Sequence, residues 1–256
     1  MSDLFNNENS LDDLEAPLAD RMRPQSLDEV IGQNHLLGEK GPLQNMLTSG
    51  IFSSIILWGP PGVGKTTIAR LLADQSSSHF EQLSAIFTGV GDLKKVFEAA
   101  KFRRTNGHKT IIFVDEIHRF NKSQQDSFLP FLEDGTIILI GATTENPSFE
   151  LNPAILSRVQ VLVLERLNNT DLKKLLERAE GVLGSKINLD LDAKIELLKV
   201  ADGDGRALLN LIENIISWEI SSPLTVKDLS GRLSKRLKKY DKKGEEHYNL
   251  ISALHK

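Results

Sequence analysis

The sequence predicts an α/β protein, in which a three-layer domain with a five-stranded parallel sheet precedes a small all-helical domain. Five short apolar runs alternate with segments of helical periodicity between residues 51 and 167, which is typical of a parallel sheet covered on both faces. After Leu167 only helical spacing continues. The apolar runs are Ile55–Trp58, Phe80–Leu83, Thr110–Val114, Thr136–Ile140 and Val159–Leu164; the intervening helical segments include Thr66–Ala73, Asp92–Phe102 and Ser123–Glu133.

Composition excludes several classes of protein. The chain has 256 residues and no cysteine, so disulfides, thiolate metal sites and cysteine nucleophiles are excluded. No apolar run approaches the roughly 20 residues of a membrane span. The N-terminus is acidic and polar, unlike a signal peptide. We therefore expect a cytoplasmic protein without a membrane partner.

Residues 1–16 are acidic and poor in large apolar side chains, and we expect them to be a disordered tail. Within them, Ser2-Asp3-Leu4-Phe5 resembles the C-terminal part of the peptide by which bacterial proteins bind the sliding clamp, although the leading glutamine is absent. A frayed tail without a partner is the alternative interpretation.

Residues 59–66, here called the phosphate loop, match the pattern G-x-x-x-x-G-K-[ST] between an apolar strand and a helix. Glycines let backbone N–H groups surround a phosphate, the lysine reaches the β- and γ-phosphates, and the hydroxyl of Thr66 ligates Mg²⁺. The following helix directs its positive end at the same anion. We therefore predict that ATP and Mg²⁺ bind here, with contacts from Gly59, Pro60, Pro61, Gly62, Val63, Gly64, Lys65, Thr66 and Thr67.

Two carboxylates, Asp115 and Glu116, follow the apolar run 111–114. Ligands of open α/β sheets bind at the carboxyl ends of the strands. We predict that Asp115 contributes to the Mg²⁺ shell and that Glu116 orients and activates the attacking water. A simple strand-end turn is the alternative, which the phosphate loop makes less attractive.

Three further polar positions are candidates for phosphate contacts. The strand before Thr143 and Thr144 ends in hydroxyl and amide side chains that either contact the γ-phosphate or cap the strand. Arg158 precedes the fifth apolar run, and arginine binds phosphate through a planar pair of donors. Arg206 begins a helix, an electrostatically unfavourable place for a cation, so we expect an anion such as phosphate beside it.

Residues 168–240 predict the helical domain. Apolar side chains recur with helical spacing in three segments, and Asp171, Asp204 and Thr225 are plausible N-caps. Residues 241–256 begin another amphipathic helix without a stop signal. We expect the sequence to end inside a longer protein.

These elements, in this order, resemble an AAA+ ATPase of the clamp-loader clade. Three strings are similar to the replication-associated recombination protein A family, which is related to the Werner-helicase-interacting protein. They are DEIHRFNKSQQD (115–126), IGATTENPSFELNPAILSR (140–158) and GEEHYNLISALHK (244–256).

The resemblance implies roles for individual residues. Asp115 and Glu116 correspond to the Walker B pair, and Thr144 to sensor 1. Arg158 corresponds to the arginine finger that acts on ATP in a neighbouring subunit, and Arg206 to sensor 2. With Lys65, we therefore expect Glu116, Thr144 and Arg158 to be the catalytic residues.

The resemblance also implies an architecture. The ATPase core would span 17–167, with sheet order 5-1-4-3-2, and the lid 168–240. Residues 18–33 would pack on the adenine, with Ile31 and Gly32 contacting the nucleotide. Residues 241–256 would start a C-terminal oligomerisation domain.

The function implied is a DNA-dependent ATPase that remodels or protects stalled replication forks and gapped or single-stranded DNA during recombination and repair. It would form homo-oligomers at the nucleoid and contact a sliding clamp or single-strand-binding protein. The alternatives are a nucleotide-gated scaffold with slow hydrolysis, and a clamp-loader or branch-migration ATPase. The basic stretch near Lys94, Lys95, Lys101, Arg103 and Arg104 is either the DNA face or a solvated helix surface.

Overall fold

A computed structural model describes residues 16–218 and 222–240 of the chain. The chain divides into two compact units, one formed by residues 24–166 and the other by residues 167–256 together with the first 23. Residues 1–15 of the predicted tail, with its clamp-like peptide, and the predicted start of a C-terminal domain lie outside the described residues. Among the described residues, no helix combines the length and the apolar character that crossing a membrane requires.

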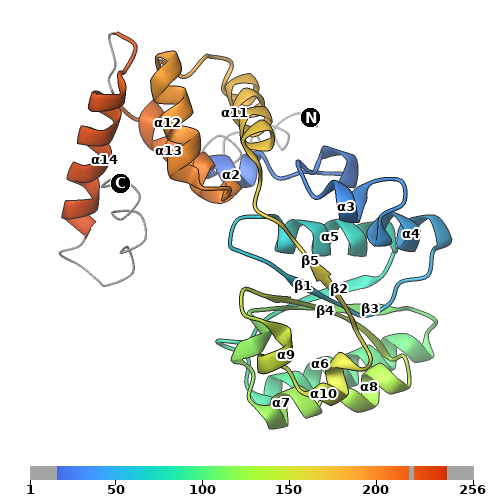
Figure 1. Cartoon of the computed structure of the whole chain (residues 1–256). Helices are drawn as coiled ribbons and strands as arrows, with labels where there is room; N and C mark the ends of the chain where they lie inside the picture. Colours follow the sequence, from blue (N-terminus) through green and yellow to red (C-terminus); the bar gives the residue numbers. More distant parts are fainter. Residues whose placement is uncertain (1–15, 219–221, 241–256) are drawn as a thin grey trace, which may run out of the picture. The chain divides into compact units, whose positions relative to one another are not determined.

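The first unit is a parallel sheet with helices on both faces (Figure 1). The strands lie in the order β2-β3-β4-β1-β5, which confirms the predicted order 5-1-4-3-2. All four neighbouring pairs are parallel. The strands are β1 (Ile55–Trp58), β2 (His79–Ser84), β3 (Thr110–Asp115), β4 (Ile137–Thr143) and β5 (Gln160–Val163).

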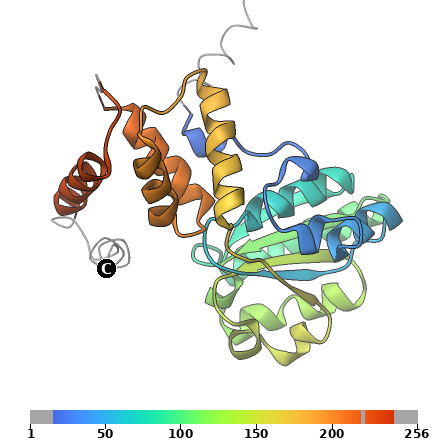
Figure 2. The same ribbon diagram turned by 45° about the horizontal axis from the view of Figure 1, so that its top comes forward.

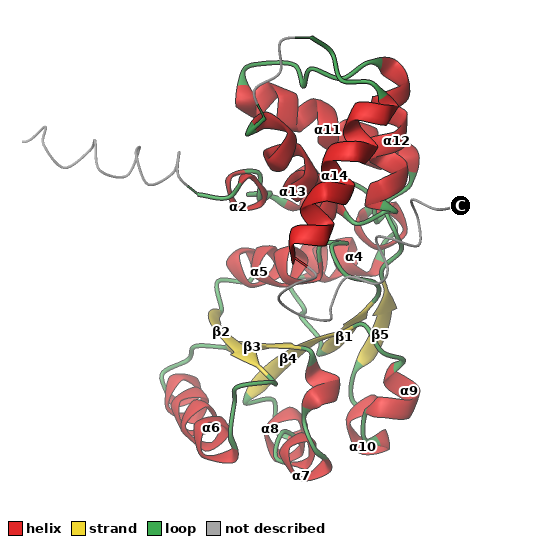
Figure 3. Cartoon of the chain, turned by 90° about the vertical axis from the view of Figure 1, so that its left-hand side faces the viewer, coloured by secondary structure: helices red, strands yellow, loops and turns green. Residues whose placement is uncertain are grey.

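The helices of this unit form the outer two layers, seen from another side in Figure 3. Helices α3 (Asn34–Leu37), α4 (Pro42–Ser49) and α5 (Lys65–Gln75) cover one face. The other face is covered by α6 (Val90–Thr105), α7 (Lys122–Asp126), α8 (Leu129–Glu133), α9 (Pro147–Glu150) and α10 (Pro153–Leu156). Two short 3₁₀ turns, η1 (Leu27–Glu29) and η2 (Ile117–Arg119), complete the unit.

Alternation along the buried strands builds a separate core on each face. On β3, Ile111 and Phe113 pack toward α5, while Ile112 and Val114 pack toward α6. All four side chains are fully buried. This two-sided burial is why the inner strands β1, β3 and β4 are near-continuous apolar runs rather than alternating ones.

The predicted helix over 123–133 is wrong in one respect, because the structure breaks it into α7 and α8. Pro130 lies in the first turn of α8. Proline lacks an N–H and its ring crowds the carbonyl four residues earlier, which is that of Asp126, the last residue of α7. The break therefore follows from Pro130.

The second unit is a helical bundle, whose helices are also visible in the view of Figure 2. It comprises α2 (Leu18–Arg21), α11 (Asn169–Leu183), α12 (Leu191–Ala201), α13 (Gly205–Ile216) and α14 (Val226–Tyr240). Helix α12 was not named among the sequence predictions. The N-cap of α11 is Asn168 rather than the predicted Asp171, whose own N–H donates to Asn168 Oδ1 at 2.9 Å.

The start of the ATPase core also needs correction, since residues 17–23 belong to the helical unit. Leu18 and Met22 are buried in the core of the bundle. The N–H of Leu18 donates to Glu213 Oε1 on α13 at 3.0 Å. The segment 18–33, expected to act as one adenine-binding piece, is therefore divided between the two units after Arg23.

Candidate functional site

The phosphate loop connects β1 to α5. Gly62 and Gly64 have φ values of 68° and 96°, the left-handed conformation that glycine adopts without strain. Gly64 is also the N-cap of α5, so no side chain caps the first turn of this 11-residue helix. Its backbone N–H groups are therefore not satisfied by a capping side chain, as an anion site requires.

Lys65 lies within the loop, with 8% of its surface exposed. Its Nζ donates to Gly59 O at 2.6 Å and to Pro60 O at 2.8 Å. Carbonyl oxygens are weaker partners for an ammonium group than phosphate oxygens. The loop thus holds a buried cation beside an uncapped helix end, and this combination fits a nucleotide phosphate.

Gly59 is required by a close approach of the chain that follows β5. A Cβ at Gly59 would lie 2.4 Å from Leu164 O and 2.9 Å from Leu164 Cβ. The N–H of Gly59 donates to Thr143 O at 3.1 Å, which fixes the loop to the end of β4. The first glycine of the loop therefore serves packing as well as phosphate approach.

The strand order brings the other predicted groups together at the carboxyl-terminal ends of the strands, where the phosphate loop also lies. Asp115 ends β3, Thr143 ends β4, and β4 lies between β3 and β1. Asp115 and Thr66 are both half-buried, and Asp115 Oδ1 accepts from the Glu116 N–H at 3.1 Å. No group of three or more His, Cys, Asp or Glu side chains among the described residues forms a metal cage. Mg²⁺ bound with substrate phosphates needs only one or two protein ligands, so this pair fits it.

Glu116 adopts a left-handed conformation, with φ of 52°. Its carboxylate lies 3.3 Å from His118 Nε2, and His118 Nδ1 lies 2.9 Å from Thr143 Oγ1. The sequence prediction missed His118, because it stopped at the two carboxylates. A titratable residue two positions after Glu116 was the available signal.

Thr143, rather than Thr144, makes the polar contacts at the end of β4. Thr143 is fully buried, and its Oγ1 accepts from the Glu145 N–H at 3.0 Å. Thr144 is half-buried and follows the last residue of the strand. Its predicted contact with the γ-phosphate stays a prediction.

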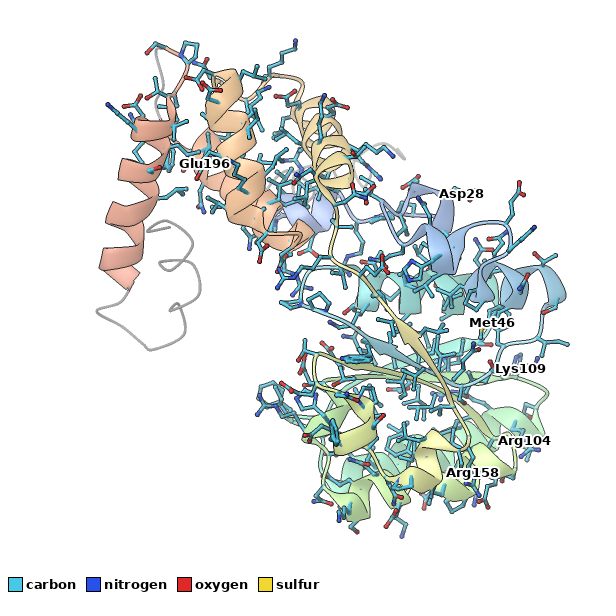
Figure 4. All side chains as sticks on the ribbon, in the orientation of Figure 1. Asp28, Met46, Arg104, Lys109, Arg158 and Glu196 are labelled. Atoms are coloured by element: carbon cyan, nitrogen blue, oxygen red, sulfur yellow. The ribbon has the colours of Figure 1, made fainter. Side chains whose placement is uncertain are left out.

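Arg158 lies just before β5, at the amino-terminal end of that strand (Figure 4). The phosphate loop follows the opposite, carboxyl-terminal end of β1. Its guanidinium donates to Glu133 Oε1 at 2.5 Å and to Ala154 O at 2.8 Å. Because the strands are parallel, the length of β5 separates Arg158 from the phosphate loop of its own chain. An action of Arg158 on nucleotide would thus require a second copy of the chain.

Ile31 and Gly32 are half-buried and precede an amide clamp. The side chain of Gln33 donates to Glu165 O at 2.7 Å and accepts from the Glu165 N–H at 3.0 Å. Glu165 follows Leu164, the neighbour of Gly59. The clamp thereby connects residues 31–33 to the chain that packs on the phosphate loop, a contact that sequence reading did not find.

Arg206 lies in the first turn of α13 and is exposed. It belongs to the helical unit, whereas the phosphate loop belongs to the other. Asp204, the N-cap of α13, accepts from the Ala207 N–H at 2.8 Å and places a negative charge at this helix end. The electrostatic argument for a phosphate beside Arg206 is therefore weaker than the sequence alone indicated.

The basic residues of α6 do not form a single free surface. Arg103 lies 3.6 Å from Glu81, and Arg104 lies 3.3 Å from Asp134. Lys101 lies over the ring of Phe131 at 5.0 Å. Lys94 and Lys95 are exposed at the other end of the helix, where Lys95 lies 3.7 Å from Asp92 in a solvent-exposed pair. Because an exposed pair of this kind is weak, these two lysines are the better candidates for contact with a polyanion.

Comparisons with known proteins agree with this architecture. The ATPase family associated with various cellular activities (AAA) matches residues 55–167, and its AAA C-terminal domain matches residues 183–256. A solved structure of Thermotoga maritima RuvB, titled a Holliday junction branch migration motor, superimposes with a TM-score of 0.68 at 23% identity, covering 89% of this chain and 76% of that one. That likeness shows the fold.

Curated relatives are more similar in sequence. Replication-associated recombination protein A is 48% identical in Coxiella burnetii and 44% identical in Escherichia coli K12, in each case over 94% of this chain. The ATPase WRNIP1 of Dictyostelium discoideum is 41% identical over 94% of this chain and 30% of its own length. The chain spans 56% of the length of the first two relatives. It belongs to the AAA ATPases, in the family of replication-associated recombination protein A.

Proposed function

We propose that this chain is a Mg²⁺-dependent ATPase whose hydrolysis is stimulated by single-stranded or forked DNA. One observation carries the proposal. Lys65, an uncapped helix N-terminus and the pair Asp115–Glu116 all lie at the carboxyl-terminal ends of the strands of one sheet. The names of its relatives associate the family with replication and recombination. A role in remodelling or protecting stalled forks, through homo-oligomers at the nucleoid, is the biological context that we infer.

The residues of the loop would bind and orient the triphosphate. The Lys65 ammonium would exchange the carbonyls of Gly59 and Pro60 for phosphate oxygens, which are stronger acceptors. Thr66 and Asp115 would hold Mg²⁺, which offsets the charge on the phosphate oxygens when bound. Catalysis in this class is mostly positioning and charge stabilisation, so preorganised groups carry it.

Glu116 would orient the attacking water and receive its proton. Arg158 of a second copy would stabilise the charge that develops on the transferred phosphoryl group. Arg206 and the end of β4 at Thr144 would report the state of the nucleotide to the rest of the molecule. These roles rest on the family and on the positions of the residues.

DNA would contact the segment that leads into α6. Phe87 is 85% exposed and Val90 58% exposed, and Lys94 and Lys95 follow on the helix. Exposed aromatic side chains stack on bases, and nearby lysines bind the backbone. Replacing both lysines with alanine should weaken DNA binding and flatten its dependence on salt, whereas Lys173→Ala on α11 should do neither.

Steady-state phosphate release tests the enzymatic proposal. Wild type should hydrolyse ATP, faster with forked DNA, and Glu116→Gln should lower the rate by about 100-fold or more while ATP still binds. Equal low rates for both proteins, with and without DNA, would favour a nucleotide-gated scaffold and overturn the proposal. Fork binding without strand remodelling in a gel assay would favour protection over remodelling.

A further inference from the structure

A chain of polar contacts joins the ends of two neighbouring strands beside the phosphate loop. Glu116 Oε2 lies 3.3 Å from His118 Nε2, and His118 Nδ1 lies 2.9 Å from Thr143 Oγ1. Only 9% of the His118 side chain and 30% of the Glu116 side chain are exposed. The imidazole is thus a largely desolvated link between the end of β3 and the end of β4.

The turn that carries His118 is fixed by its neighbours. Ile117 is fully buried and Phe120 is 2% exposed, so both flanks of the turn are anchored in the core. Gly141 makes room for this packing, since a Cβ there would lie 2.6 Å from Ile56 Cδ1 and 3.0 Å from Ile117 Cδ1. The position of the imidazole is therefore set by core packing and not by its own flexibility.

The two ring nitrogens of His118 face different partners. Nδ1 lies 2.9 Å from Thr143 Oγ1, which accepts from the Glu145 N–H at 3.0 Å and donates its hydroxyl proton to Glu145 O at 3.3 Å. Nε2 faces the Glu116 carboxylate at 3.3 Å, and because an ionised carboxylate can only accept, a proton on Nε2 favours this contact.

The backbone conformation of Glu116 makes a side-chain partner such as His118 important for the direction of its carboxylate. A left-handed backbone is unfavourable for a residue with a Cβ, and such conformations persist where the surroundings enforce them. That conformation directs the residue out of the line of β3, and the described structure gives its carboxylate the His118 contact. A carboxylate that orients water must keep one direction, and an imidazole nitrogen held 3.3 Å away on a fixed turn provides that restraint.

We propose that His118 is a positioning residue for the hydrolytic reaction, which holds the Glu116 carboxylate in place and ties it to the end of β4 through Thr143. This inference rests on the proposed ATPase function. It also supplies a physical route by which a change at the end of β4, where the γ-phosphate is expected to be read, would reach Glu116.

Kinetics test the link between His118 and Glu116. His118→Ala should lower kcat about 10- to 100-fold while KM and the affinity for a fluorescent ATP analogue stay within about 2-fold. His118→Gln, whose amide can donate from near the position of Nε2, should recover part of the loss. His108→Ala, at an exposed histidine before β3, is the matched control and should behave as wild type.

A double-mutant cycle separates positioning from an independent effect. Under single-turnover conditions, His118→Ala should add little to Glu116→Gln, because the group that it positions is already disabled. A full additional loss would show that His118 does not act through Glu116, and would overturn the inference. Circular dichroism of each variant establishes that it is folded.

A nucleotide-free readout is available from the imidazole itself. Nitrogen-15 spectra of histidine-labelled protein should show a proton on His118 Nε2, the nitrogen that faces Glu116, with the signal assigned by its loss in His118→Gln. Thr143→Val should shift the Nδ1 resonance, since it removes the hydroxyl that lies 2.9 Å from Nδ1. A freely averaging His118 signal, insensitive to Thr143→Val, would contradict the network.

The outcomes distinguish this inference from the function on which it depends. If wild type does not hydrolyse ATP under any condition, the proposed function fails. If wild type hydrolyses ATP and His118→Ala matches His108→Ala in kcat, the ATPase stands and the positioning role is rejected.

Discussion

At the scale of single residues, packing against neighbouring backbone and the local backbone conformation determine which residues the phosphate loop can contain. Gly59 faces the backbone of Leu164, and Gly64 takes a conformation that suits glycine alone. Lys65 is buried against carbonyls of the loop itself. Contacts within the chain therefore fix the shape of the loop, which limits the entropy that nucleotide binding must overcome.

Gly59→Ala tests the packing requirement. The added Cβ would meet backbone atoms of Leu164, which cannot move as a flexible side chain can, so we expect a loss of about 1–3 kcal/mol in unfolding free energy. Urea unfolding followed by Trp58 fluorescence, in a Trp218→Phe background, measures this. Gly91→Ala on α6, where an added Cβ would meet no atom within 4 Å beyond its chain neighbours and its own helix backbone, should instead stabilise by up to about 1 kcal/mol. Equal stability of both variants would contradict the packing argument.

At the scale of elements, residues 115–126 make structural contacts that the resemblance to a family did not predict. Asn121 and Gln124 cap α7 reciprocally. Gln125 is 2% exposed and donates to Phe120 O at 3.0 Å and Glu150 O at 3.1 Å, while it accepts from the Asn152 N–H at 2.7 Å. These bonds fasten η2, and with it His118, to α9 and α10.

The elements themselves were predictable because their signals are local. A buried strand such as Ile111–Val114 and an amphipathic helix such as α13 show their periodicity within a few residues. Contacts between distant positions carry no such signal. Gln33 reaches Glu165, 132 residues away, and Leu18 reaches Glu213, 195 residues away. The clamp on residues 31–33 and the start of the helical unit therefore required the structure.

The helical unit contains a carboxylate whose charge contributes to stability. Burial alone would raise the pKa of Glu180, but hydrogen bonds from Lys194 Nζ at 2.8 Å and the Ile187 N–H at 3.1 Å outweigh it and hold the pKa below its ordinary value of 4.5. A folded-state pKa below the unfolded one gives stability that is present above pH 4.5 and is lost as the pH falls through the folded value.

Glu180→Gln should therefore destabilise the helical unit by about 1–2 kcal/mol at pH 7, with the difference shrinking as the pH falls below the ordinary pKa of Glu180. Trp218 fluorescence in a Trp58→Phe background reports the unfolding. The exposed Glu177, 3.9 Å from Lys173, is the matched control, and Glu177→Gln should cost under about 0.5 kcal/mol. A Glu180 effect independent of pH would show that charge is not its cause.

At the scale of the whole molecule, the position of Arg158 makes an assembly part of the proposed mechanism. Arg158 lies at the amino-terminal end of β5, away from its own phosphate loop, and its guanidinium donates a hydrogen bond to Glu133. Both side chains are partly exposed, 37% for Arg158 and 53% for Glu133, so the pair is worth at most about 1 kcal/mol. A phosphate of a neighbouring copy would compete with Glu133 for the same guanidinium.

The position of Arg158 predicts how specific ATPase activity depends on protein concentration. Specific ATPase activity should rise with concentration in wild type and stay low in Arg158→Ala. Glu133→Gln should shift the half-activating concentration downward by about 2- to 5-fold, because the competing carboxylate is removed. Activity that is independent of concentration in all three proteins would place the complete catalytic machinery within one copy.

The most direct test of the whole account is calorimetric titration of the chain with ATP and Mg²⁺, for wild type and Lys65→Ala, with Lys173→Ala as the control. We predict one nucleotide per chain for wild type and the control, and a loss of affinity of about 100-fold or more for Lys65→Ala, because the buried ammonium that faces the phosphates is gone. Equal affinity of Lys65→Ala and wild type would mean that the phosphate loop does not bind the nucleotide, and would contradict the account at its base.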